Sequence, residues 1–142
     1  MRIRLGHVAI YTKDIERSAD FYLKYFGGEV TYSSDNPRHK TRFIAFGPET
    51  TALEIMQIPD IPDNPCLPGG EQMGLTHLAF DIGGTKELLE LTERIRADGF
   101  PVVVEPTDYG TTEFFESCVL DPDGVRVEIG VPAWILHKER GE

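Results

Sequence analysis

The chain has 142 residues, of which 40% are hydrophobic and 27% charged, the balance of an ordinary globular protein rather than of a disordered or fibrous one. This length falls in the range of one domain, roughly 100–200 residues, and it allows a hydrophobic core without disulfide staples. The 14 Lys and Arg against 24 Asp and Glu give a net charge of −10, which argues against nucleic acids and anionic membranes as partners, because both are bound through basic surfaces.

The first half of the chain predicts one strand, one helix and three more strands. A run rich in Ile, Val and Leu begins this half, with His7 inside it. The next segment has apolar side chains at helical spacing, Thr12 or Asp14 to cap its start, and two glycines to end it. The predicted elements are a strand over 3–11, a helix within 12–28, and strands over 29–34, 40–46 and 51–58.

A segment rich in Pro and Gly follows over 59–74, and its composition predicts a linker without regular structure. After it, the same order of elements starts again. The Asp-Pro-Asp-Gly sequence at 121–124 lies between two apolar runs, which predicts a tight hairpin turn. The predicted elements are a strand over 75–82, a helix over 85–99, strands over 101–106, 113–120 and 125–131, and a short tail over 132–142.

The two halves are an internal repeat of one βαβββ module, and the predicted fold class is α+β. The repeat extends to the residues themselves, because LGHVAI matches LTHLAF and LEIM matches VEIG. We expect a first module over 1–58, the linker over 59–74, a second module over 75–131 and the tail over 132–142, together forming one domain.

The cysteine content favours a reducing compartment. Cys66 and Cys118 form no CxxC motif and no disulfide framework, so we expect both to be reduced thiols. No apolar run approaches the ~18–20 residues that span a bilayer, and the first ten residues do not resemble a secretory signal. The sequence therefore predicts a cytoplasmic protein.

Four polar residues occupy matching places in the two modules. The first strand of each module carries a histidine and the last strand a glutamate, namely His7 and Glu54, then His77 and Glu128. A lone histidine in an apolar strand is usually a core residue, but an ionised carboxylate between apolar neighbours costs several kcal/mol unless it is paired or bound to a cation. If the two sheets pair about a pseudo-two-fold axis, the four side chains converge. Two imidazoles and two carboxylates suit Ni, Co, Zn or Fe(II) better than Mg or Ca.

The chain resembles the vicinal oxygen chelate superfamily, also described as glyoxalase/bleomycin resistance/dioxygenase proteins, over nearly its whole length. The segments that carry the resemblance are HVAIYTKDIERSADFYLKYFGGE, GLTHLAFDI and ESCVLDPDGVRVEI. Within the superfamily the quartet is similar to that of the glyoxalase I (lactoylglutathione lyase) enzymes. The resemblance implies that His7, Glu54, His77 and Glu128 hold a divalent ion, namely Ni, Zn or Co.

The same resemblance implies an isomerase or lyase that acts on a thiol adduct of an α-ketoaldehyde such as methylglyoxal, by metal-assisted proton transfer. It makes Glu128 the catalytic base and Glu54 its counterpart. It also implies a homodimer with a small-molecule substrate, the metal site lying within one chain or across two. Members that use glutathione usually place an Arg shortly after the first ligand, whereas this chain reads His7-Val8-Ala9-Ile10-Tyr11 there. The resemblance therefore leaves the thiol open.

Other members of the superfamily provide alternatives. Methylmalonyl-CoA epimerases share the proton transfer but tend to carry Gln at the second ligand position, which is Glu54 here. Thiol transferases that modify fosfomycin and extradiol dioxygenases use two His and one Glu. Binding proteins of the bleomycin-resistance type have no metal ligands and are not enzymes. The intact quartet favours the glyoxalase I interpretation over these four alternatives.

Substrate contacts are predicted at two places outside the quartet. Arg38 and Arg42 supply cations from the region before and within the third strand. Tyr109 and Thr111 belong to a loop between the second module's second and third strands, and we expect this loop to line the cavity.

Overall fold

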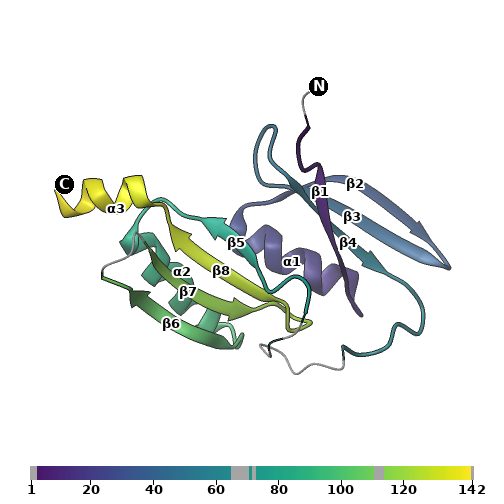
Figure 1. Cartoon of the computed structure of the whole chain (residues 1–142). Coiled ribbons are helices and arrows are strands. Elements are labelled where there is room, and N and C mark those ends of the chain that lie inside the picture. The colour runs from purple at the N-terminus through teal and green to yellow at the C-terminus, as the bar shows by residue number, and fades with distance from the viewer. Residues whose placement is uncertain (1–2, 65–70, 72, 111–113, 142) are drawn as a thin grey trace. The chain divides into compact units, whose positions relative to one another are not determined.

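The computed structural model of the chain describes residues 3–64, 71, 73–110 and 114–141. Two compact units are present, Met1–Asn64 and Pro65–Glu142. The first has a sheet and α1, and the second has a sheet with α2 and α3 (Figure 1). Each unit contains the predicted βαβββ order, so the α+β fold with two modules is confirmed. None of the helices among these residues is long and apolar enough to cross a membrane.

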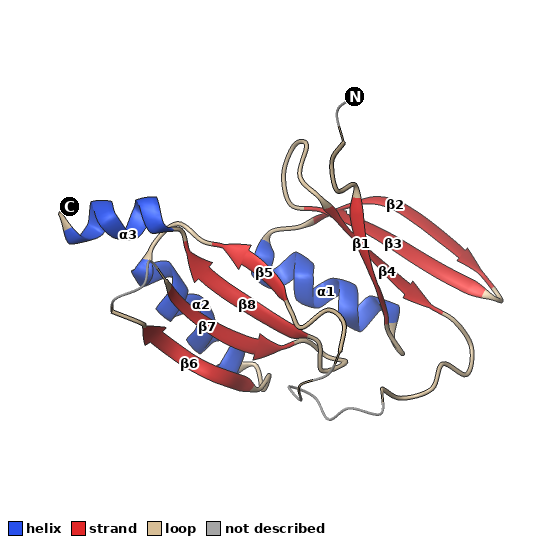
Figure 2. Cartoon of the chain, viewed as in Figure 1, coloured by secondary structure: helices blue, strands red, loops and turns tan. Residues whose placement is uncertain are grey.

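The first unit is a four-stranded sheet with one helix against it (Figure 2). Strand β1 pairs parallel with β4, and the other neighbours are antiparallel, which gives the order β1-β4-β3-β2. The elements are β1 (His7–Tyr11), α1 (Ile15–Phe26), β2 (Glu29–Asn36), β3 (His39–Ala45) and β4 (Ala52–Gln57).

Helix α1 begins and ends where the sequence predicts. The Asp14 carboxylate accepts a hydrogen bond from the Arg17 N–H at 3.1 Å, which satisfies one of the free N–H groups of the first turn. Gly27 ends the helix with φ 64°, a left-handed conformation that glycine adopts without steric cost. The helix packs against β3 and β4, and this contact decides which face of the sheet is core.

Strand alternation then separates apolar from polar side chains on β4. Leu53 and Ile55 are buried, whereas Glu54 between them is partly exposed. Because successive side chains of a strand point to opposite faces, Glu54 lies on the sheet face opposite to the one that α1 covers. We call this the helix-free face of the unit. The sequence therefore puts a carboxylate on the helix-free face without burying it in the core.

The second unit repeats this arrangement, with the strand order β5-β8-β7-β6 and β5 parallel to β8. Helix α2 packs against β6, β7 and β8. Thr92 of α2 and Ser117 of β7 are both buried and share a hydrogen bond of 2.8 Å between their hydroxyls. The elements are β5 (Leu78–Asp81), α2 (Thr85–Ala97), β6 (Val102–Asp108), β7 (Phe115–Leu120), β8 (Arg126–Val131) and α3 (Ala133–Arg140).

The turn at 121–124 sets the register of the β7–β8 hairpin. One carboxylate oxygen of Asp121 accepts hydrogen bonds from the N–H groups of Asp123 at 2.9 Å and Val125 at 2.8 Å. The strands leave this turn with Leu120 opposite Arg126, and Cys118 is therefore opposite Glu128. A local turn motif thus decides which residues of β7 are neighbours of Glu128.

The strands differ from the predicted ones mainly at their starts. β1 begins at His7 and β5 at Leu78, because their ladders with β4 and β8 begin opposite Ala52 and Val127. His77 consequently lies just before β5 rather than inside a strand.

The tail forms the helix α3. Glu139 of α3 accepts a hydrogen bond from the Thr85 N–H at 3.1 Å. It thereby caps the first turn of α2, because the N-cap residue Gly84 has no side chain that could accept this bond. Arg140 also pairs with Asp108 at 2.9 Å. The tail is therefore attached to the second unit at both α2 and β6.

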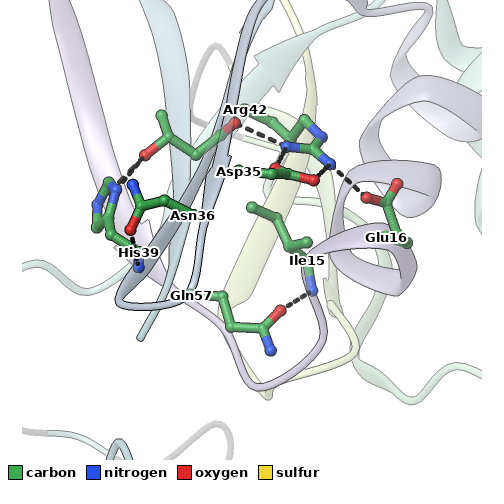
Figure 3. A network of polar contacts seen from close by, with 8 residues as sticks. Ile15, Glu16, Asp35, Asn36, His39, Arg42 and Gln57 are labelled. Carbon is green, nitrogen blue, oxygen red and sulfur yellow. Dashed lines mark hydrogen bonds and ion pairs between the residues drawn. The ribbon is translucent and has the colours of Figure 1, made fainter. Parts of the chain in front are cut away.

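Arg42 ties the β2–β3 hairpin to α1 (Figure 3). Its guanidinium is buried; it pairs with Glu16 of α1 at 2.5 Å and with Asp35 of β2, and it donates to the Thr41 carbonyl at 2.9 Å. The hydrogen bond from Arg42 lowers the pKa of the Asp35 carboxyl. A cation therefore connects two strands and the helix on the core side of the sheet.

The variant Arg42→Leu is expected to lower the free energy of unfolding by about 1–2 kcal/mol, because both carboxylates are more than half exposed and can be rehydrated. Because the pKa of Asp35 is lowered in the folded protein, Asp35 contributes its full stabilisation at pH values above its ordinary pKa of 3.8. This stabilisation is lost as the pH falls below that value. Urea unfolding at neutral and acidic pH measures both effects. Arg38→Leu, at an exposed turn position, is the control. Equal losses in the two variants, or an Arg42→Leu effect that grows on acidification, would contradict this account.

Candidate metal centre

The first unit brings His7 and Glu54 together on its helix-free face. β1 and β4 are parallel with Ala9 opposite Glu54, so the residue two positions before Ala9 lies on the same face of the sheet. The His7 Nε2 and Glu54 Oε2 atoms are 3.5 Å apart. The carboxylate is 16% exposed and the imidazole 52%, which leaves the pair accessible from one side.

An aromatic side chain holds the His7 ring in place. Phe43 of β3 is opposite Glu54, and its ring meets the His7 ring edge-to-face at a centroid distance of 5.4 Å. Tyr32 of β2 packs in turn on Phe43 at 5.9 Å. Edge-to-face contacts of this kind restrict ring orientation, so the imidazole is positioned by apolar packing.

The second unit repeats the pair with His77 and Glu128. The His77 Nε2 and Glu128 Oε2 atoms are again 3.5 Å apart, with side-chain exposures of 41% and 25%. Here the hydroxyl of Thr76 orients the ring, because its Oγ1 lies 2.9 Å from His77 Nδ1. If Nδ1 donates its proton to Thr76, the Nε2 lone pair faces the carboxylate side and is free to bind a cation.

Each pair has the chemistry and spacing of two ligands on one ion. Neutral imidazole nitrogen and carboxylate oxygen are ordinary ligands of divalent transition metals. Two donors held about 2.1 Å from one ion at right-angle to tetrahedral angles are roughly 3.0–3.4 Å apart, close to the observed 3.5 Å. Within the described parts of the chain, no three His, Cys, Asp or Glu side chains are grouped to hold a metal ion. Each unit thus offers two donors of the kind that a divalent ion binds.

The predicted substrate contacts have different surroundings. Arg42 is next to Phe43 in β3 and points to the opposite face, toward Glu16 of α1, away from the His7–Glu54 pair. Arg38 is exposed in the β2–β3 turn, where its N–H donates to the Asn36 side chain at 3.0 Å. The structure therefore engages Arg42 in the core and leaves Arg38 exposed.

The other two contacts were predicted in the second unit. Tyr109 directly follows β6 and is 45% exposed. Thr111 lies outside the described residues, as does Cys66.

Two residues of β7 were missed by the sequence interpretation. Cys118 is directly opposite Glu128, and Glu116 is opposite Gly130, so both lie on the helix-free face of the second unit. Burial raises the pKa of the Cys118 thiol. Burial, and then the neighbouring Glu128 carboxylate, raise the pKa of Glu116. The sequence contains a signal for both. The turn at 121–124 fixes which residues of the two strands are opposite one another, and strand alternation then puts Glu116 and Cys118 on the same face as Glu128.

The chain matches a family of known proteins over most of its length. The model of the Glyoxalase/Bleomycin resistance protein/Dioxygenase superfamily matches residues 4–129. The lactoylglutathione lyase of Escherichia coli O157:H7 is 32% identical over 133 residues, covering 89% of this chain and 91% of the lyase.

Solved structures agree with this match at the level of the fold. The trypanothione-dependent glyoxalase I of Leishmania major superposes with a TM-score of 0.75 at 24% identity, covering 99% of this chain and 94% of that one. A mutant of the fosfomycin resistance protein FosX from Listeria monocytogenes, complexed with Mn(II), gives a TM-score of 0.71 at 23% identity over the full length of both chains. On the family match and the repeated βαβββ fold, the chain belongs to the Glyoxalase/Bleomycin resistance protein/Dioxygenase superfamily.

Proposed function

We propose that the chain is a metal-dependent, glyoxalase I-like isomerase that converts the thiol adduct of an α-ketoaldehyde, such as methylglyoxal, into a hydroxyacyl thioester. The observation that carries the proposal is the repeated His–Glu pair, with the same 3.5 Å separation on the helix-free face of each unit. The similarity to lactoylglutathione lyases over 89% of the chain supports it.

The metal part of the proposal assigns one divalent ion, Ni, Zn or Co, to both pairs jointly. Its ligands are His7, Glu54, His77 and Glu128, drawn from one chain or from two chains of a homodimer. When bound, such an ion acts as a Lewis acid toward the oxygens of the substrate. Phe43 and Thr76 orient the two imidazoles for this role.

The proton transfer is assigned to the glutamates. Glu128 takes the proton from the carbon that bears the sulfur and the hydroxyl, and it returns this proton to the adjacent carbonyl carbon. The hydroxyl proton of the first carbon passes to the oxygen of the old carbonyl. The first carbon thereby becomes the thioester carbonyl and the second an alcohol, so the step needs no oxidant or reductant. Glu128 is the more exposed of the two carboxylates, which suits it to reach a substrate. Glu54 is its counterpart in the first unit.

Removing both carboxylates should abolish metal binding. After chelation and reconstitution, wild-type protein is expected to retain about one ion per chain. The double variant Glu54→Gln, Glu128→Gln should retain almost none, because only the two neutral imidazoles remain. Metal analysis of the desalted proteins makes the comparison.

The matched control for this experiment is the double variant Glu29→Gln, Glu90→Gln, which makes the same charge change at exposed positions and should bind like wild type. Wild-type metal retention in the Glu54, Glu128 double variant would remove the metal assignment.

The reaction itself is tested by mixing methylglyoxal with glutathione and, separately, with other small thiols, and following thioester formation. Metal-loaded wild-type protein should form thioester with at least one thiol. At saturating metal, with the ion content measured alongside, Glu128→Gln should lower kcat by about 100-fold or more, because it removes the base as well as one metal ligand.

No thioester with any thiol, together with exchange of the α-proton of a CoA ester with solvent, would replace the proposal by an epimerase. The absence of both reactions beside tight retention of a small aromatic ligand would favour a binding protein without catalysis.

A further inference from the structure

The two units differ in the side chains that surround their His–Glu pairs. In the first unit Phe43 is opposite Glu54, and Thr41 is opposite Met56 two residues further along. At the matching places of the second unit, Cys118 is opposite Glu128 and Glu116 is opposite Gly130. The second unit therefore has the carboxylate of Glu116 where the first unit has the hydroxyl of Thr41. The internal repeat does not explain this difference.

Glu116 is a near neighbour of the pair on the same face. Residues diagonally opposite on adjacent antiparallel strands are within reach of long side chains, and Glu116 is diagonal to Glu128 across the β7–β8 ladder. The Glu128 carboxylate in turn lies 3.5 Å from His77 Nε2, so Glu116 is on the same face of the sheet as this pair. Two carboxylates thus lie side by side next to His77.

The surroundings of Glu116 include a third carboxylate and one guanidinium, those of Asp81 and Arg126. Gly130, which faces it, has no side chain, and Asp81 of β5 faces Gly130 from the other side. A Cβ atom at Gly130 would meet the Asp81 carboxylate at 3.9 Å. Arg126 is on the same face, where it interacts with Cys118. Like charges held this closely in a partly buried place destabilise the metal-free protein, and a bound cation relieves that repulsion.

We propose that Glu116 is a positioning residue of the metal centre, a carboxylate outside the ligand set whose charge beside Glu128 and His77 strengthens the binding of a divalent ion. The proposal rests on the proposed metal function. It leaves Glu116 outside the proposed ligand set, which the two His–Glu pairs already fill. We expect Glu116 to lower the stability of the metal-free protein and to raise its affinity for the ion.

These opposite effects distinguish the proposed role from a merely structural one. In Glu116→Gln, a chelator competition titration with Zn²⁺ or Ni²⁺ should show affinity about 10-fold weaker than wild type. The metal-free variant should melt roughly 2–5 °C higher than metal-free wild type, because one of two crowded charges is gone. Glu116→Asp keeps the charge and should recover most of the lost affinity. Glu90→Gln makes the same charge change on exposed α2 and should leave both values unchanged.

The proposal is overturned if Glu116→Gln binds the ion as tightly as wild type or tighter, if Glu90→Gln loses as much affinity, or if metal-free Glu116→Gln melts lower than metal-free wild type. It is also overturned if Glu116→Asp binds no better than Glu116→Gln. A wild-type protein that binds neither Zn²⁺ nor Ni²⁺ would refute the metal function itself, and the Glu116 role with it. If wild-type protein binds the ion tightly and Glu116→Gln binds it equally well, only the proposed role of Glu116 is refuted.

Discussion

The structure depends on the cost of placing a carboxylate in the middle of an apolar strand. Glu54 lies between the buried Leu53 and Ile55, and Glu128 between the buried Val127 and Ile129. Strand alternation turns both carboxylates to the face that α1 or α2 leaves uncovered, where a histidine meets each one at 3.5 Å. The helices therefore determine where the candidate centre lies. Each helix covers one face of its sheet, and the His and Glu side chains lie on the other face.

The repeat provides two similar halves, but each half orients its histidine differently. The first unit uses the Phe43 ring against His7, whereas the second uses the Thr76 hydroxyl against His77. Aromatic packing and a hydrogen bond both fix a ring, but only the hydrogen bond selects which ring nitrogen carries the proton. The second unit also has Glu116 beside its glutamate. The repeat thus accounts for the shared donors, whereas the side chains around them differ between the units.

Much of the fold could be predicted from the sequence, because its signals are local. The cap at Asp14, the left-handed Gly27 and the turn at Asp121 each act through hydrogen bonds or backbone conformations within a few residues. The starts of β1 and β5 could not be predicted, because they depend on where a distant partner strand begins. The sequence predicts only a tail where the helix α3 lies. The contact that attaches α3 is a hydrogen bond between Glu139 and the first turn of α2, and these residues are far apart in the sequence.

The candidate site comes from the same kind of local signal. The repeat makes His7, Glu54, His77 and Glu128 the candidate ligands, because two modules with the same residue at the same place are visible without coordinates, and this assignment stays a prediction. Arg42 was assigned to substrate from its charge, whereas its alternation with Phe43 puts it against α1. Glu116 was missed because its meaning comes from the hairpin register, which pairs it with Gly130 beside Glu128.

We propose above that two imidazoles and two carboxylates from the two units bind one ion. X-ray absorption at the metal edge of the zinc- or nickel-loaded protein tests it most directly. The account predicts a shell of nitrogen and oxygen near 2.0–2.2 Å, roughly the range for such ligands, with two imidazole contributions. One imidazole contribution should disappear in His7→Ala and one in His77→Ala. A sulfur neighbour at about 2.3 Å, or a spectrum that neither substitution changes, would contradict the claim.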